Sequence, residues 1–297
     1  MEQFDWRSAA AARGLKVTDL AEHVGTRIDG IALDDEHDAE TIAIVRAACV
    51  ERTLLLFRGQ ENVSPADYLA FANLFGGRPD RHSLRHYCLP DHHEIFVVGN
   101  VHEKEARVGS PKVGLNWHTD HYHLPEPGLF TYLHAIEVPK DQGDTRYANG
   151  IAAYEALPVD KRAEIEGLKV LHSRARLFKN LFPEATEEEM EAERRKIPDV
   201  VHPLVRTHPE LRKRGLYLGG EWGSMIDGID PAAAQGLYDE LLQHMIQDRF
   251  SYRHRWLAGD VLMSDNRCSI HRASEWDEAS AVRRLHRIIM IDSEAPY

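Results

Sequence analysis

The sequence predicts a β-rich α+β fold with a double-stranded β-helix (jelly-roll) core and flanking helices. Two observations predict it: many short apolar segments separated by polar turns, and helical segments that interrupt them without regular alternation. The chain has 297 residues and is 43% hydrophobic, which suits one large core rather than two. We therefore expect a single domain over residues 1–297, with an inserted, charged helical segment at about 174–200.

The expected strands are short and mostly apolar. The first two lie within residues 16–33, around Gly25 and Gly30. The segment 53–57 is almost wholly apolar, which is typical of a buried strand. The remaining expected strands lie at 95–98, 129–138, 217–219, 251–255, 260–264 and 285–291.

The expected helices are identified by apolar residues at helical spacing and by their end signals. The best-defined start is Ser64-Pro65-Ala66-Asp67, with Ser as N-cap, Pro in the first turn and an acid three residues after the cap. The segment 184–196 is strongly charged, which predicts a solvated surface helix. The other expected helices span 36–52, 152–157, 161–168 and 231–249.

Net charge and cysteine content restrict what the chain binds and where it works. The formal charge is −12, so we expect no nucleic-acid partner, which would require a basic patch. No apolar run approaches the roughly 18 residues of a membrane span, so we expect no membrane partner. Cys49, Cys88 and Cys268 are an odd number at unrelated spacings, which indicates a cytoplasmic protein. The sequence leaves open whether the chain forms a homo-oligomer.

The segment His118-Thr119-Asp120, followed far downstream by His271, is the most informative pattern. On a β-strand, residues two apart point to the same face, so His118 and Asp120 would lie together. Two imidazoles and one carboxylate can occupy one face of a metal ion and leave the opposite face open. That ligand set is typical of non-haem Fe(II) oxygenases.

Further motifs surround this pattern in a fixed order. Trp117 precedes it, Gly143-Asp144-Thr145 follows it, Asp265-Asn266-Arg267 leads to His271, and Arg283 and Arg287 close the series. At these residues the chain resembles the taurine dioxygenase / 2,4-dichlorophenoxyacetate dioxygenase family (TauD/TfdA-like) of Fe(II)/2-oxoglutarate-dependent dioxygenases. The resemblance extends from about residue 24 to about 292 and includes two N-terminal blocks, 56–60 and 71–76.

The resemblance implies the cofactors and their residues. His118, Asp120 and His271 would bind Fe(II) and form the catalytic centre, where O2 reacts. The co-substrate 2-oxoglutarate would be bound by Arg283, whose guanidinium can pair bidentately with a carboxylate, and by the hydroxyl of Thr145. Arg284 is the neighbouring alternative, since it points to the other strand face. The implied reaction hydroxylates a substrate and releases succinate and CO2.

The resemblance also implies a small anionic organic substrate, a carboxylate or sulfonate. Arg287, four residues after Arg283, would bind its acidic group, unless it pairs with a protein acid such as Asp277 or Glu278. The other residues expected to contact the substrate are His121, Gly114, Arg85, His86 and Tyr87.

Several roles remain open at this stage. Trp117 packs beside the site or belongs to the core, and Asn266 and Arg267 either brace the strand that bears His271 or form a plain turn. Two other functions compete with the dioxygenase hypothesis: a zinc-dependent hydrolase that uses His121 and His123, and a non-catalytic, cupin-like metal-binding protein.

Overall fold

The computed structural model describes residues 4–81, 84–103, 106–110 and 114–297. Its centre is a nine-stranded, mostly antiparallel sheet in which only the β2–β3 pair, among the described strands, is parallel. The strand order is β1-β2-β3-β17-β9-β19-β6-β5, and β4 pairs with β19 at the side. The strands are β1 (Lys16–Asp19), β2 (Thr26–Asp29), β3 (Leu54–Phe57), β17 (Val261–Asp265), β9 (Gly128–Glu137), β19 (Arg284–Ile291), β6 (His92–Gly99), β5 (Cys88–Leu89) and β4 (Arg78–Pro79).

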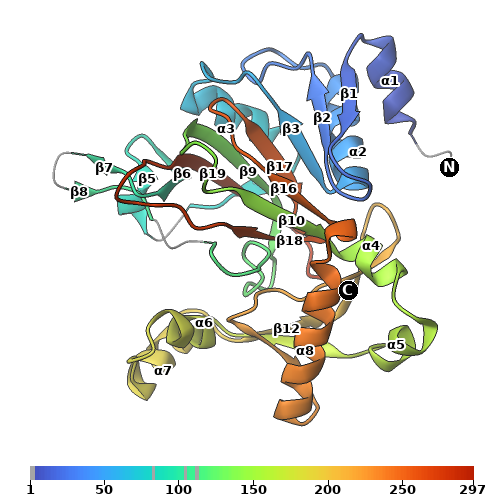
Figure 1. Cartoon of the computed structure of the whole chain (residues 1–297), viewed down its shortest axis with the longest axis vertical. Helices are drawn as coiled ribbons and strands as arrows, with labels where there is room; N and C mark the ends of the chain where they lie inside the picture. Colours follow the sequence, from blue (N-terminus) through green and yellow to red (C-terminus); the bar gives the residue numbers. More distant parts are fainter. Residues whose placement is uncertain (1–3, 82–83, 104–105, 111–113) are drawn as a thin grey trace.

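A smaller antiparallel sheet completes the region that holds the site. It has the order β16 (Ser251–His254), β10 (Thr145–Asn149) and β18 (Ser269–Ala273). Tyr147 of this sheet packs in one apolar cluster with Leu54, Leu56 and Leu262 of the large sheet. The two sheets therefore share a core on their facing sides, and Figure 1 shows their strands running past one another.

Helices cover the other face of the large sheet. They are α1 (Trp6–Ala12), α2 (Ala39–Arg52) and α3 (Pro65–Asn73). Leu55 and Phe57 of β3 pack into this helical side of the core, whereas Leu54 and Leu56 face the small sheet. This alternation confirms that the apolar segment 53–57 forms a strand buried on both faces.

Most of the remaining elements form the lower part of the molecule in Figure 1, whereas β7 and β8 lie beside β5. A third apolar cluster joins α4 and α8 to the small sheet and to β11 and β15. The elements are α4 (Gly150–Glu155), α5 (Val159–Glu164), α6 (Arg174–Leu181), α7 (Glu187–Lys196), α8 (Pro231–Met245), β11 (Lys169–His172), β12 (Val200–Pro203), β13 (Val205–Thr207), β14 (Arg214–Leu216), β15 (Ser224–Asp227), β7 (His102–Glu103) and β8 (Ala106–Arg107), with short 3-10 turns at Arg85–Tyr87 and Asp248–Phe250.

The expected charged helix is confirmed as α7, which follows α6 within the segment 174–200. Thr186 and Glu189 form a reciprocal capping box at its start, which satisfies two of its orphan backbone donors. None of its residues is buried, and Figure 1 shows α6 and α7 side by side beside β12, far from α1. That the whole segment is an insertion into a single domain stays a prediction.

The predicted start of α3 agrees with the structure, whereas one of the predicted strands does not. Ser64 caps α3 through a hydrogen bond from Asp67 N, as expected. The expected strand at 217–219 is wrong, because β14 ends at Leu216 and Gly219 has a positive φ of 73°. No helix in the described part of the chain is long and apolar enough to cross a membrane.

Candidate metal centre and active site

His118, Asp120 and His271 meet between the two sheets. Their ligand atoms all lie within 4.8 Å of one another. The Nε2 atom of His118 is 3.9 Å from Asp120 Oδ1, and the Nε2 atom of His271 is 3.7 Å from Asp120 Oδ2. The expected grouping of these three residues is therefore present in the structure.

The backbone that produces this grouping differs from the expected strand. His118 exchanges both backbone hydrogen bonds with His271 of β18, so a single β-bridge aligns the two imidazoles. A turn then begins at Asp120, and His121 has a left-handed φ of 56°. The strand expected to carry both His118 and Asp120 is therefore reduced to this bridge at His118, because the chain turns away at Asp120.

The charge states of the two imidazoles suit a metal ligand. His118 Nδ1 lies 2.8 Å from the carbonyl oxygen of Asn116, which can only accept, so Nδ1 carries the hydrogen and Nε2 keeps its lone pair. Burial lowers the pKa of His118, and burial together with His118 lowers the pKa of His271 to about 3. Both rings are therefore neutral at pH 7, as metal ligation requires.

Asp120 supplies the negative charge of the cluster. Burial opposes its ionisation, but the Arg287 guanidinium and the two imidazoles hold the pKa of its carboxyl well below the usual range. Arg287 Nη1 is 3.2 Å from Asp120 Oδ1. The protein acid that pairs with Arg287 is thus Asp120, and neither Asp277 nor Glu278, which the sequence offered as alternatives.

Arg283 lies at the other end of the site. Its side chain is buried, with only 2% exposed, and its Nε donates to the Gly143 carbonyl at 3.2 Å. Burial lowers its pKa to about 10, and the described residues offer its guanidinium no carboxylate within ion-pair distance. Gly143 permits this approach, because it has a φ of 67° and an added Cβ would lie 3.1 Å from Arg283 Cδ. A buried cation in this state is costly unless an anion meets it.

Thr145 and Tyr147 extend the site along β10. Thr145 Oγ1 accepts a hydrogen bond from Trp256 Nε1 at 3.0 Å, which leaves its own hydrogen available. Tyr147 pairs with His271 across the strands and stacks on its ring, with centroids 5.5 Å apart and planes 25° apart. Tyr147 was not predicted from the sequence, although its two-residue spacing from Thr145 on a strand places both on the same face.

This chain is similar to known dioxygenases over most of its length. Residues 16–289 match the family model described as taurine catabolism dioxygenase TauD, TfdA family. The chain belongs to the TauD/TfdA family. The alpha-ketoglutarate-dependent 2,4-dichlorophenoxyacetate dioxygenase of Cupriavidus pinatubonensis is 36% identical over 254 residues, 82% of this chain and 85% of that protein.

Two further comparisons cover nearly the whole chain. The alpha-ketoglutarate-dependent sulfate ester dioxygenase of Pseudomonas putida is 29% identical over 293 residues, 97% of this chain and 93% of that protein. The crystal structure of AAD-2 in complex with Mn(II) and N-oxalylglycine has a TM-score of 0.80 and 27% identity, and covers 95% of this chain and 98% of that one. The chain is accordingly an enzyme of the dioxygenase class.

The residues expected to contact a substrate are less closely gathered than the three candidate metal ligands. Gly114 borders it, since an added Cβ would lie 3.4 Å from His118 Cε1. Tyr87 packs on Phe96, which in turn lies under the Arg287 guanidinium at 5.0 Å. The expected contacts Arg85 and His86 are both exposed.

Among the described residues, His121 and His123 do not join a second group of potential metal ligands. His121 Nε2 contacts Asp80 Oδ2 at 2.8 Å, and burial, followed by the charge of His121, lowers the pKa of His123 to about 3. Neither belongs to a group of potential metal ligands among the described residues. The geometry required by the zinc-hydrolase alternative is therefore missing from this part of the chain.

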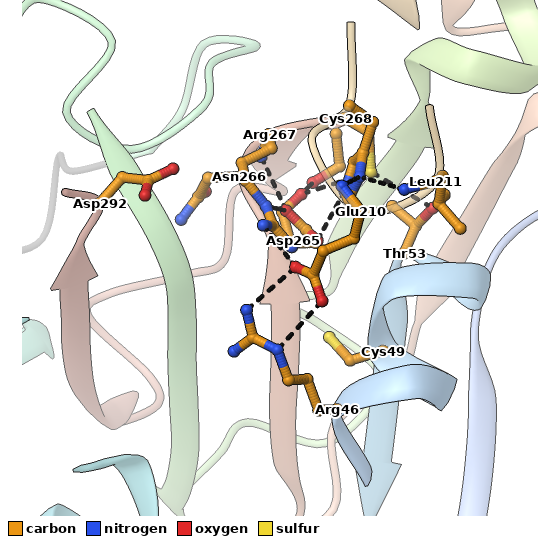
Figure 2. A network of polar contacts seen from close by, with 12 residues as sticks. Arg46, Cys49, Thr53, Glu210, Leu211, Asp265, Asn266, Arg267, Cys268 and Asp292 are labelled. Atoms are coloured by element: carbon orange, nitrogen blue, oxygen red, sulfur yellow. Dashed lines mark hydrogen bonds and ion pairs between the residues drawn. The ribbon is translucent and has the colours of Figure 1, made fainter. Parts of the chain in front are cut away.

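His208, Asp265 and Cys268 form a second group of potential ligands, but both carboxylate oxygens of Asp265 already accept hydrogen bonds from other residues. Arg267 donates to both carboxylate oxygens of Asp265, and His208 donates to Oδ2 at 3.1 Å. Figure 2 shows Glu210 continuing this network between Arg267 and Arg46. The network braces the Asp265–Arg267 turn of the family motif.

Trp117, whose place the sequence left open, packs in the apolar cluster that also contains Ala148 and Ile270.

Proposed function

We propose that this TauD/TfdA-family enzyme is an Fe(II)- and 2-oxoglutarate-dependent dioxygenase that hydroxylates a small organic anion. The observation that carries the proposal is the meeting of two neutral imidazoles and one carboxylate in the described chain, together with the buried Arg283 guanidinium, whose charge interacts with the Tyr147 side chain that stacks on His271. The first three groups match the open ligand set of non-haem iron enzymes. The fourth supplies a buried positive charge for a co-substrate carboxylate.

The residues fit Fe(II). His118, Asp120 and His271 would be its ligands and the catalytic centre, and His271 Nδ1 is buried without a hydrogen-bond partner among the described residues. Iron, when bound, would supply O2 activation and the oxidative decarboxylation that yields succinate and CO2. The protein contributes neutral imidazoles, an ionised carboxylate and a site from which bulk water is largely excluded.

Arg283 and Thr145 would hold 2-oxoglutarate. The buried guanidinium can form a bidentate, charge-assisted pair with the distal carboxylate, and the Thr145 hydroxyl retains a hydrogen to donate. The structure of AAD-2 with Mn(II) and N-oxalylglycine supports this role, since it is a close structural neighbour. The antiparallel sheets likewise support the jelly-roll core, with the site between its two halves.

Arg287 would bind the acidic group of the substrate. Its Nε is buried without a hydrogen-bond partner among the described residues, although its Nη1 pairs with Asp120. The relatives named for 2,4-dichlorophenoxyacetate and for sulfate esters support a carboxylate or a sulfur oxyanion as that group. His121, Gly114 and the loop that contains Arg85, His86 and Tyr87 would form the rest of the pocket. We also propose a cytoplasmic location, which the three free, buried cysteines support.

The test begins with anaerobic addition of Fe(II) and 2-oxoglutarate to the purified protein. A weak visible charge-transfer band is expected when the keto acid chelates the iron, and an absent band with retained Zn(II) binding would favour a hydrolase. A panel of aryloxyalkanoates, other carboxylates, sulfonates and sulfate esters is then screened for succinate release. A protein that gives the band but releases no succinate with any substrate would be a binding protein.

A further inference from the structure

The carboxylate of Asp120 is held by more than its charge partner. Thr131 of β9 donates a hydrogen bond of 2.6 Å to Asp120 Oδ2, and Arg287 donates to the other oxygen, Oδ1. Thr131 and Asp120 are both buried. Each carboxylate oxygen therefore has a donor on one side, which limits rotation of the group about its Cβ–Cγ bond.

The direction of the Thr131 hydrogen bond is set by Asn266. A hydroxyl has a single hydrogen, and Asn266 Nδ2 donates to Thr131 Oγ1 at 2.9 Å. The hydroxyl hydrogen cannot point back toward that amide group, so it points toward Asp120. Asn266 thus orders Thr131, and Thr131 orders Asp120.

The Asn266 amide has only one workable orientation. Its Oδ1 accepts a hydrogen bond from Asp120 N at 3.3 Å, whereas the Thr119 hydroxyl, which has a single hydrogen, lies closer to the Asn266 backbone carbonyl, at 2.9 Å, than to Oδ1, at 3.2 Å. A flipped amide would turn its NH2 group toward the Asp120 N–H donor and lose the contact with Asp120 N. The same side chain therefore fixes the backbone of the ligand segment and the hydroxyl that meets the ligand.

Two further features hold Asn266 in place. It sits in the turn that Asp265 and Arg267 lock by two side-chain hydrogen bonds, as Figure 2 shows. Gly128 allows β9 to pass close by, because an added Cβ would lie 2.8 Å from both Asn266 Nδ2 and the Asp120 carbonyl oxygen. Asn266 thus braces the segment at Asp120, a contact that neither of the two roles left open by the sequence, a brace for the strand that bears His271 or a plain turn, includes.

We infer that Asn266 and Thr131 are positioning residues that preorganise Asp120 for the metal ion. The inference rests on the proposed function, because it assigns Asp120 to an Fe(II) site. Neither residue is one of the three candidate ligands. They act through Asp120, by reducing the number of carboxylate orientations that the metal would otherwise have to select.

The experiment compares metal affinity in matched variants. Co(II) and Mn(II) dissociation constants are measured, without 2-oxoglutarate or substrate, for the full chain and for Thr131→Val and Thr131→Ser. Thr131→Val keeps the shape of the side chain but removes the hydroxyl. It should weaken the binding of both metals by roughly 10-fold or more, within the range for groups that orient a ligand. Thr131→Ser restores a hydroxyl and should return the affinity to within about twofold of the original.

Ser264→Ala is the control for lost stability. Ser264 of β17 is buried and lies directly opposite Thr131 of β9. Its hydroxyl donates a hydrogen bond to the Thr131 carbonyl oxygen and not to Asp120. The Ser264→Ala variant should therefore have a lower melting temperature than the unaltered protein but the same affinity for both metals. Asn266→Asp should weaken metal binding, because a carboxylate there would accept the Thr131 hydrogen and draw it from Asp120.

The outcomes separate the inference from the proposed function. If the unaltered protein binds neither metal, the proposed iron site fails, and the inference with it. If the unaltered protein binds and folded Thr131→Val binds equally well, only the positioning role is overturned. That role is also overturned if Thr131→Ser is as weak as Thr131→Val, since then the hydroxyl is not what matters.

Discussion

Arg287 Nη1 lies 3.2 Å from Oδ1 of Asp120, so a buried guanidinium is paired with a candidate metal ligand. The guanidinium also lies over the Phe96 ring at 5.0 Å, and its Nε has no hydrogen-bond partner in the described part of the chain. A divalent cation bound to Asp120 would compete with Arg287 for this carboxylate. An anionic substrate would then give Arg287 a new negatively charged partner.

Arg287→Gln should separate substrate binding from the other functions of the site. A lost hydrogen bond between charged groups corresponds to about 1.5–3 kcal/mol, or roughly 10- to 100-fold in the Michaelis constant of the substrate. The Michaelis constant of 2-oxoglutarate should stay nearly unchanged.

The comparison of an active carboxylate substrate with its neutral amide tests the same point. The unaltered enzyme should prefer the acid strongly, and Arg287→Gln should remove most of that preference. Equal turnover of acid and amide by the unaltered enzyme would show that Arg287 does not bind the acidic group.

Arg283→Ala should act on 2-oxoglutarate rather than on the substrate. The buried guanidinium has no ion pair among the described residues, so a co-substrate carboxylate would be its main anionic partner. We expect the Michaelis constant of 2-oxoglutarate to rise by the order of 10- to 100-fold, from about 1.5–3 kcal/mol. Arg284→Ala is the matched control, since Arg284 is only half-buried and begins β19. An equal effect from both variants would contradict the assignment.

The grouping of the ligands could be predicted because it depends on ordered motifs. His118, Asp120, His271 and Arg283 each stand in a segment whose neighbours are also characteristic. The structure brings the first three together, and Tyr147 lies against His271 and near the Arg283 charge. Of the two adjacent arginines, Arg283, which the sequence favoured for the co-substrate, is buried, whereas Arg284 is only half-buried.

The supporting contacts could not be predicted, because they join segments through space. Thr131 lies in an apolar strand with no motif around it, and its contact with Asp120 depends on how the turn at Asp120 meets β9. The left-handed φ of His121 could not be predicted either, since only a few per cent of non-glycine residues adopt a positive φ. The pairing of Arg287 with Asp120 could not be predicted either, because the two residues are 167 positions apart in the sequence and meet only in the folded chain.

Alanine substitution at the three candidate ligands should abolish coupled turnover. His118→Ala and His271→Ala should each weaken Mn(II) binding by more than the roughly 10- to 100-fold typical of an outer group. Asp120→Ala should do the same and also destabilise the fold, because it leaves the buried Arg287 unpaired. His121→Ala and His123→Ala are the controls, and both should retain metal binding. The opposite pattern, with binding lost only in the two controls, would favour the zinc alternative.

His286 should make the stability of the metal-free protein depend on pH. Burial, aided by His134 and Arg284, lowers the pKa of its imidazole from 6.5 to about 3. Between these values the unfolded chain binds a proton that the folded chain does not, so the free energy of unfolding must fall as the pH falls below 6.5. The slope from this one group approaches about 1.4 kcal/mol per pH unit.

Denaturant unfolding with a chelator present, at pH values from about 7 down to about 5, measures this slope across the window in which His286 differs between the two states. The slope should be shallower for His286→Gln than for the unaltered protein. His102→Gln, which changes an exposed histidine, should leave the slope as it was. Because the measured quantity is the slope, a uniform loss of stability in His286→Gln does not affect the test. Parallel slopes for all three proteins would instead show that His286 takes up a proton equally well in the folded state.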